Sequence, residues 1–157
     1  MRVFRVEAVV CAESHEVLVG DAAQQGDAEP LVAESARERE PEAEAFRWPG
    51  GDQILIFTRG ELVTLAIEGW DAPPPGKAEG ESEWGWESHG RWDVMDDLFA
   101  GDMGPGGPAF TSAGFPMMPP GPYVVRARAA GRSAPELADL DEDGPGAERY
   151  LVQYWPE

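Results

Sequence analysis

The chain has 157 residues, with 12 Lys and Arg against 30 Asp and Glu, which gives a formal net charge of −18. This length fits one domain with one hydrophobic core, and this charge excludes direct binding to the phosphate backbone of nucleic acids, which requires a cationic surface. The charge favours a basic protein partner, or serves solubility alone.

Two strands are predicted at the beginning of the chain. Residues 2–10, "RVFRVEAVV", alternate polar and apolar side chains as a half-buried strand does, and residues 15–21, "HEVLVGD", form a second, short strand. Cys11 is the only cysteine, so no intrachain disulfide can form. Glu7 interrupts a first apolar run that is too short for a signal peptide, and no later run is long enough to span a membrane. We therefore expect a soluble cytoplasmic protein.

The next segment, 22–45, is rich in Ala, Glu, Arg and Gln and has few large apolar residues. A short helix over residues 31–40, stopped by Pro41, fits this composition, and so does an acidic loop.

The clearest strand signal lies in residues 50–70, "GGDQILIFTRGELVTLAIEGW". Two β-rich runs, Gln53–Thr58 and Glu61–Glu68, flank Arg59 and Gly60. The pattern predicts a tight antiparallel hairpin, and because both faces are largely apolar we place it centrally in a sheet.

Residues 71–116 are expected to be a long loop or insert, because Pro, Gly and charged residues dominate them. Within this segment, "WDVMDDLF" (92–99) fits either a strand or a single helical turn. Beyond it, Tyr123–Ala130 and Arg149–Trp155 alternate as two strands of a terminal hairpin around an acidic loop. Six or seven short strands without a convincing amphipathic helix predict an all-β protein, a single-domain antiparallel β-sandwich or open barrel over residues 1–157.

No cofactor or metal is expected. The stretch "DLDEDG" (139–144) has the spacing that begins a calcium loop, but Tyr150 stands where a bidentate Glu is needed. The two histidines, His15 and His89, do not make a zinc motif without further ligands. Cys11 and His15 are too far apart along a strand to act as nucleophile and base. We interpret residues 139–144 as an exposed acidic hairpin loop.

An enzymatic alternative rests on Asp93, Asp96, Asp97 and Asp102, which lie near several tryptophans that include Trp92. Glycosidases use paired carboxylates beside aromatic platforms, so this grouping is compatible with a small hydrolase. The common nucleophile, metalloprotease, phosphate and dinucleotide motifs are absent from the sequence. A further alternative is a structural or assembly protein that associates with itself through an uncovered sheet face.

Three stretches resemble the competence protein J family. They are "FRVEAVVCAESHEVLVGD", "AFRWPGGDQILIFTRGELVTLAIEG" and "MMPPGPYVVRARAAG" followed by "ERYLVQYWPE". Members of this family are small, acidic, cytoplasmic bacterial proteins that inhibit a DNA-entry nuclease. The resemblance implies a β-sandwich whose carboxylates take the place of phosphates on the active-site face of a basic enzyme.

Charge and resemblance together predict a binding protein rather than an enzyme: an inhibitor or immunity partner of a basic, nuclease-like protein. Carboxylates would fill anion-binding sites of that partner, and a tryptophan would anchor the contact. The predicted partner-binding residues are Trp92, Asp93, Asp96, Asp97, Asp139, Asp141, Glu142 and Asp143.

Overall fold

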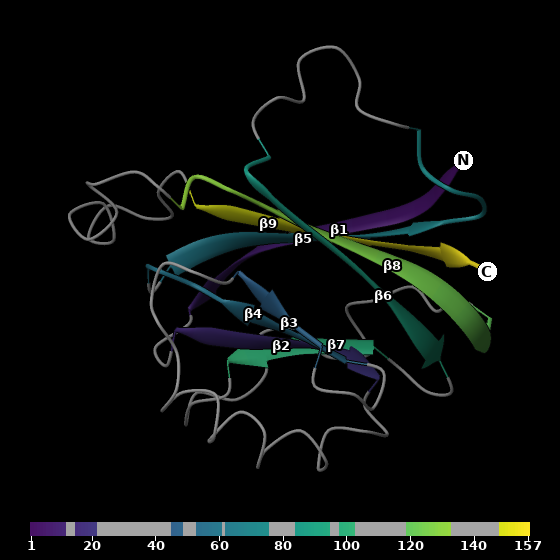
Figure 1. The fold of residues 1–157 in the computed structure, drawn as a ribbon, viewed down its shortest axis with the longest axis horizontal. Helices are drawn as coiled ribbons and strands as arrows, with labels where there is room; N and C mark the ends of the chain where they lie inside the picture. Colours follow the sequence, from purple (N-terminus) through teal and green to yellow (C-terminus); the bar gives the residue numbers. More distant parts are fainter. Residues whose placement is uncertain are drawn as a thin grey trace.

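The computed structural model describes residues 1–11, 15–21, 45–48, 53–60, 62–75, 84–94, 98–102, 119–132 and 148–157. Nine strands in two sheets make up this part of the chain, and it contains no helix. The two sheets form two layers, with both ends of the chain at the same end of the molecule (Figure 1). No helix long and apolar enough to cross a membrane occurs within these ranges.

The larger sheet has five strands. Their spatial order is β1 (Arg2–Cys11), β5 (Leu62–Trp70), β9 (Arg149–Pro156), β8 (Gly121–Ala130) and β6 (Trp86–Val94). Neighbouring strands run antiparallel, except for β5 and β9, which are parallel from Thr64 opposite Arg149 to Gly69 opposite Tyr154. Strand β9 thus fills the position between β5 and β8.

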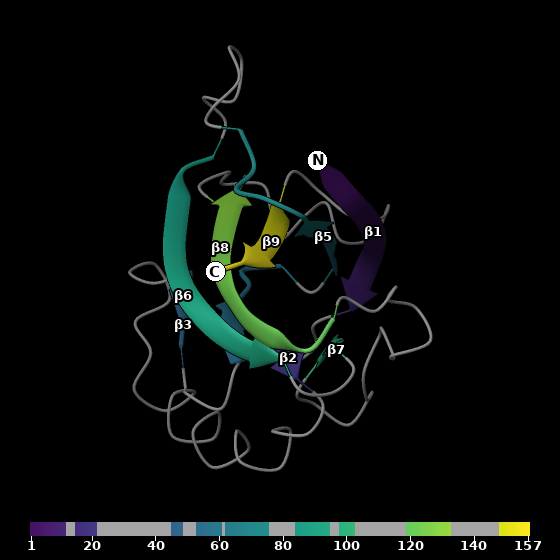
Figure 2. The ribbon, with the colours of Figure 1, turned by 90° about the vertical axis from the view of Figure 1, so that its right-hand side faces the viewer.

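The smaller sheet has four strands, all paired antiparallel. Their order is β3 (Phe46–Arg47), β4 (Gln53–Phe57), β2 (Glu16–Asp21) and β7 (Leu98–Asp102). Figure 2, turned by 90°, shows the strong curvature of the larger sheet around the molecule.

One hydrophobic core lies between the two sheets. In each strand of the larger sheet, alternate side chains point inward, because successive residues of a strand face opposite sides. Val10, Ile67 and Val152 from this sheet, and Val19 and Ile54 from the smaller one, are all fully buried in the same cluster. The 2–10 alternation predicted from sequence is confirmed, with Phe4 and Val6 packed against this core.

The predicted strand positions are largely confirmed, but the pairing of residues 53–68 was wrong. Strands β4 and β5 form where expected, each internal to a sheet, yet they belong to different sheets and do not pair with each other. The intervening residues 58–60 form a corner between the layers. Their backbone groups bond to distant residues, Thr58 N–H to the His15 carbonyl and Arg59 N–H to the Glu148 carboxylate.

The structure also tests the predictions for residues 71–116 and for the terminal hairpin. Residues 71–116, expected to be a loop or insert, contain strand β6 and strand β7, one in each sheet. The terminal hairpin is confirmed, since β8 and β9 pair antiparallel from Tyr123 opposite Pro156 to Ala130 opposite Arg149. The helix considered for residues 31–40 lies outside the described residues.

Candidate functional site

Of the eight predicted partner-binding residues, the structure describes two, and it places them on opposite faces of β6. Asp93 is exposed on the outer face, whereas Trp92 is 1% exposed and packs in the core. Its ring lies 5.8 Å from that of Tyr154. Trp92 is therefore a core residue and cannot anchor a partner, which corrects the prediction. The other six residues, at 96–97, 139 and 141–143, lie outside the described ranges.

The described ends of the terminal acidic loop are held at the corner between the two sheets. Glu148, 1% exposed, accepts hydrogen bonds from the backbone N–H groups of Arg59 and Gly60, each at 2.7 Å. The Arg59 guanidinium in turn donates to the Arg132 carbonyl oxygen. A carboxylate bound to two backbone donors is a strong hydrogen-bond acceptor, so Glu148 is held firmly at this corner, and Arg59 also holds Arg132, the residue that precedes segment 133–147.

The Tyr150 hydroxyl completes this corner. It lies against the Glu148 carboxylate and 3.0 Å from the Phe57 carbonyl oxygen. Burial raises the pKa of the Tyr150 hydroxyl well above its usual value, and the neighbouring Glu148 raises it further. The hydroxyl is thus a fixed hydrogen-bond donor, which suits a structural joint and not a group that exchanges protons near neutrality.

The ends of other acidic segments meet the same corner. The Ala45 carbonyl, at the end of segment 22–44, accepts from Phe57 N–H at 2.9 Å, and the His15 carbonyl accepts from Thr58 N–H at 2.9 Å. The Arg149 guanidinium lies over the Trp84 ring, 5.1 Å from its centroid. We call this group the anchor cluster; its members are His15, Ala45, Phe57, Thr58, Arg59, Gly60, Trp84, Arg132, Glu148 and Arg149.

The net charge of the protein is distributed unevenly with respect to this cluster. The described residues include nine Arg and ten Asp or Glu, so they account for −1 of the total of −18. Segments 22–44 and 133–147 have a net charge of −5 each, 76–83 has −2, and 12–14 and 61 have one carboxylate each. Each of these segments is bounded on at least one side by the anchor cluster. Together they hold −14 of the −18.

The arginines among the described residues are engaged within the protein. Arg2 and Arg5 bind Glu68, Arg128 binds Glu87, and Arg91 binds Glu157. The remaining five contact an aromatic ring, an amide or a carbonyl oxygen; they are Arg47, Arg59, Arg126, Arg132 and Arg149. We call the described residues the framework and the residues between them the connecting segments. Positive and negative side chains nearly balance in the framework, so the excess of carboxylates lies in the connecting segments.

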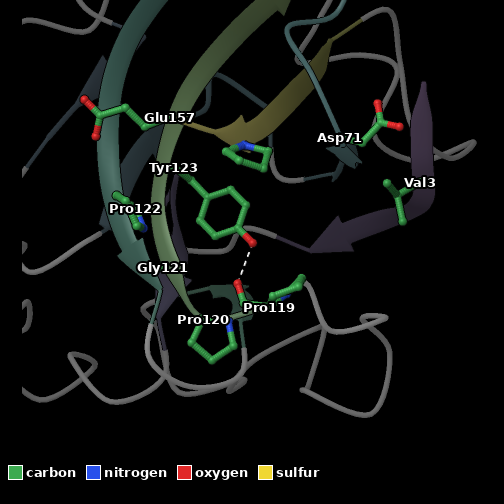
Figure 3. Close-up of a pocket in the computed structure, with 9 residues that line it drawn as sticks. Val3, Asp71, Pro119, Pro120, Gly121, Pro122, Tyr123 and Glu157 are labelled. Carbon is green, nitrogen blue, oxygen red and sulfur yellow. Dashed lines mark hydrogen bonds between the residues drawn. The ribbon is translucent and has the colours of Figure 1, made fainter.

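At the opposite end of the molecule, near both chain ends, lies an apolar pocket of about 450 Å³. Its lining consists of Val3, Asp71, Pro119, Pro120, Gly121, Pro122, Tyr123, Pro156 and Glu157 (Figure 3). The Tyr123 hydroxyl donates to the Pro119 carbonyl oxygen, and burial raises the pKa of this hydroxyl. Neither Trp92 nor Asp93 lines this pocket, so it does not provide the substrate cleft that the hydrolase alternative requires.

Among the described side chains, no group of three or more His, Cys, Asp or Glu could hold a metal ion. The calcium-like stretch 139–144 falls outside the described ranges.

The described strands define an all-β protein with two sheets, and solved structures of other proteins share this fold. No family model and no curated protein sequence matches the chain. One similar structure is that of ComJ from Bacillus subtilis, the inhibitor of the DNA-degrading activity of NucA. It has a TM-score of 0.54 and 8% identity over 100% of this chain and 98% of that one.

The second similar structure is described as crocagin biosynthetic gene J, with a TM-score of 0.57 and 14% identity over 98% of this chain and 96% of that one. At these identities the likeness lies in the fold. The resemblance to the competence protein J family noted in the sequence is confirmed at that level.

Proposed function

We propose that this chain is a cytoplasmic β-sandwich inhibitor of a basic, nuclease-like protein and catalyses no reaction itself. The observation that carries this proposal is the anchor cluster, which bounds segments holding −14 of the net charge. The likeness in fold to ComJ supports a nuclease as the target. The absence of catalytic motifs in the sequence is in keeping with inhibition by binding alone.

The mechanism follows from charge complementarity. A nuclease holds the phosphates of its substrate with cationic side chains, and carboxylates of the inhibitor can occupy the same positions. In this proposal the contacts come from Asp139, Asp141, Glu142 and Asp143, together with Asp93, Asp96 and Asp97. Trp92 is not among them, because it is buried in the core.

The first experiment is an affinity pull-down from the lysate of the source cell at low and at high salt, with the retained proteins identified by mass spectrometry. We expect one basic protein to be retained at low salt and lost at high salt, since salt screens interactions between exposed charges. Inhibition is then measured as protection of plasmid DNA from the purified target. Retention of no basic protein at either salt would contradict the proposal.

A matched pair of variants localises the contact. Asp139→Asn with Asp141→Asn should weaken binding to the purified target by about tenfold or more, because it removes charges that pair with the partner. Asp71→Asn with Glu157→Gln removes the same charge from the opposite end of the molecule and should leave the affinity nearly unchanged. Equal weakening by both pairs would indicate general electrostatic attraction without a defined inhibitory site.

A further inference from the structure

Strand β1 is an edge strand with an unusual outer face. It is ten residues long and, among the described strands, pairs with β5 alone. In Figure 2 it lies at one side of the larger sheet. The large apolar side chains that are exposed in the described part of the protein all belong to this region: Met1 at 86%, Val3 at 57% and Val9 at 50%. Long edge strands with exposed apolar side chains are natural sites for pairing with another strand.

The outward-facing residues of β1 are complementary to themselves when read in the opposite direction. They are, in order, Val3, Arg5, Glu7 and Val9, an apolar residue at each end and two opposite charges between them. Reversal of this order puts an acid opposite each base and a valine opposite each valine. The self-complementarity identifies the partner that this edge fits best, which is a second copy of the same strand.

We propose that two copies of the protein associate through β1, antiparallel and with a twofold axis at Val6. Val6 then lies opposite Val6 of the second copy, and Arg5 lies opposite Glu7 of the second copy, twice by symmetry. Phe4 lies opposite Ala8, and Val3 and Val9 meet at the two ends of the contact. The two five-stranded sheets join into one continuous sheet of ten strands.

Backbone geometry permits this register. Along an edge strand, every second residue directs its N–H and C=O groups away from the sheet. In the proposed register, even-numbered residues oppose even-numbered ones and odd oppose odd, so the outward-directed groups of both strands meet. Directly opposed residues of an antiparallel pair share one face, so the outer faces of both copies lie on the same side of the joined sheet.

The side-chain contacts of β1 within one copy can be replaced by contacts between two copies. The Arg5 and Glu7 side chains form an ion pair within the chain, with exposed fractions of 39% and 51%. An exposed ion pair of this kind contributes little to stability, so its replacement by two pairs between the copies costs little. The register of β1 with β5 shifts between Arg2 and Phe4, which confines the regular ladder between copies to Phe4–Ala8. A contact this short is expected to dissociate on dilution.

The test measures the mass of the full-length protein by sedimentation velocity over a range of concentrations. We expect a dimer that dissociates on dilution. Glu7→Arg should raise the dissociation constant by about tenfold or more, because the new arginine faces Arg5 of the second copy in both symmetric positions. As the control, Arg91→Glu reverses an exposed charge on the opposite edge strand β6 and should leave the dissociation constant unchanged.

A mixing experiment tests the register itself. The Arg5→Glu variant places an acid opposite Glu7 in both symmetric positions and should dimerise as weakly as Glu7→Arg. A mixture of the two variants restores both opposite-charge pairs and should form a heterodimer. Arg5 also binds Glu68, so circular dichroism must first show that Arg5→Glu is folded. If the Arg5→Glu variant is not folded, the dissociation constant of Glu7→Arg by itself tests the proposal. A wild-type monomer at every concentration, or a dimer insensitive to Glu7→Arg, would overturn the proposal, including the case in which the edge binds another protein instead.

Discussion

Glu68 is a buried carboxylate on the outer face of the larger sheet, 3% exposed. It accepts hydrogen bonds from Arg2, Arg5, Trp70 and Gln153, three of them from neighbouring strands. Burial by itself would raise the pKa of this carboxyl group, but the hydrogen bonds from Gln153, Arg5, Trp70 and Arg2 outweigh it and hold the pKa below its ordinary value of 4.5. Charged Glu68 therefore stabilises the folded protein.

The pH dependence of stability tests this assignment. A group whose pKa is lowered in the folded protein stabilises it above the unfolded pKa, and this contribution is lost as the pH falls. Glu68→Gln should lower the free energy of unfolding by about 2 kcal/mol at neutral pH, because it weakens several hydrogen bonds to a charged group. The difference from wild type, measured by urea denaturation, should shrink as the pH falls below 4.5. The exposed Glu157→Gln should show a much smaller difference; a gap for Glu68→Gln that stays constant down to pH 3 would refute the assignment.

At the scale of elements, a close contact between Gly90 and Trp48 ties the two sheets together. Gly90 lies in β6 of the larger sheet, and Trp48 directly follows β3 of the smaller one. A Cβ atom at position 90 would lie 2.4 Å from the Trp48 ring, and the indole N–H donates to the Ser88 hydroxyl at 2.8 Å. Glycine is therefore required at position 90 for the ring to pack against β6.

Alanine substitutions at two glycines distinguish the cost of crowding the Trp48 ring from the general effect of replacing glycine on stability. Gly90→Ala forces the Trp48 ring to move and should lower the free energy of unfolding by about 1–3 kcal/mol. Gly85→Ala is the matched control, because a Cβ atom there meets nothing within 4 Å, and it should change stability by less than about 0.5 kcal/mol. The measurement is the urea midpoint of both variants; equal midpoints would show that the ring adjusts freely.

The same strand shows how far the sequence allowed the fold and site to be predicted. Period-two alternation correctly located β1, β8 and β9, because in each of these strands alternate side chains pack into the core between the sheets. Residues 86–94 alternate just as regularly, with apolar or small residues at the even positions and polar residues at the odd ones. That alternation indicates a strand with Trp92 facing the core and Asp93 facing solvent. The glycines and acidic residues of the same segment favour a loop instead, and this is why the strand was not predicted.

The pairing of β4 and β5 could not be obtained in this way. A short turn after a strand predicts a hairpin, and nothing local to residues 58–60 shows that the chain will change sheets there. The corner depends on Glu148, almost 90 residues away, whose carboxylate binds the N–H groups of Arg59 and Gly60. Contacts between residues so distant in sequence leave no periodic pattern in either segment.

At the scale of the whole molecule, the framework is nearly neutral, and the connecting segments hold almost all of the charge. Like charges that are fixed to one group of anchoring residues repel each other in the folded state. A partner with cationic sites would relieve that repulsion on binding, so the same charges favour association and oppose folding.

Salt should therefore stabilise the free protein. We expect the midpoint of thermal unfolding to rise between about 20 mM and about 500 mM NaCl, since salt screens the repulsion. A variant with Asp139→Asn, Asp141→Asn, Glu142→Gln and Asp143→Asn should unfold at a higher temperature in low salt and respond less to added salt. Differential scanning fluorimetry gives both quantities. An unchanged salt response in this variant would mean that these four carboxylates do not contribute to the repulsion.

The position of β9 between β5 and β8 has a consequence for the order in which the protein acquires its structure. The ladders β1–β5 and β6–β8 involve segments that leave the ribosome earlier, and each can form before residues 149–156 have been synthesised. The pairs β1–β5 and β6–β8 each keep an unpaired edge until β9 inserts between β5 and β8. Parallel and long-range pairings form slowly, so this insertion is expected to be the rate-limiting event of folding.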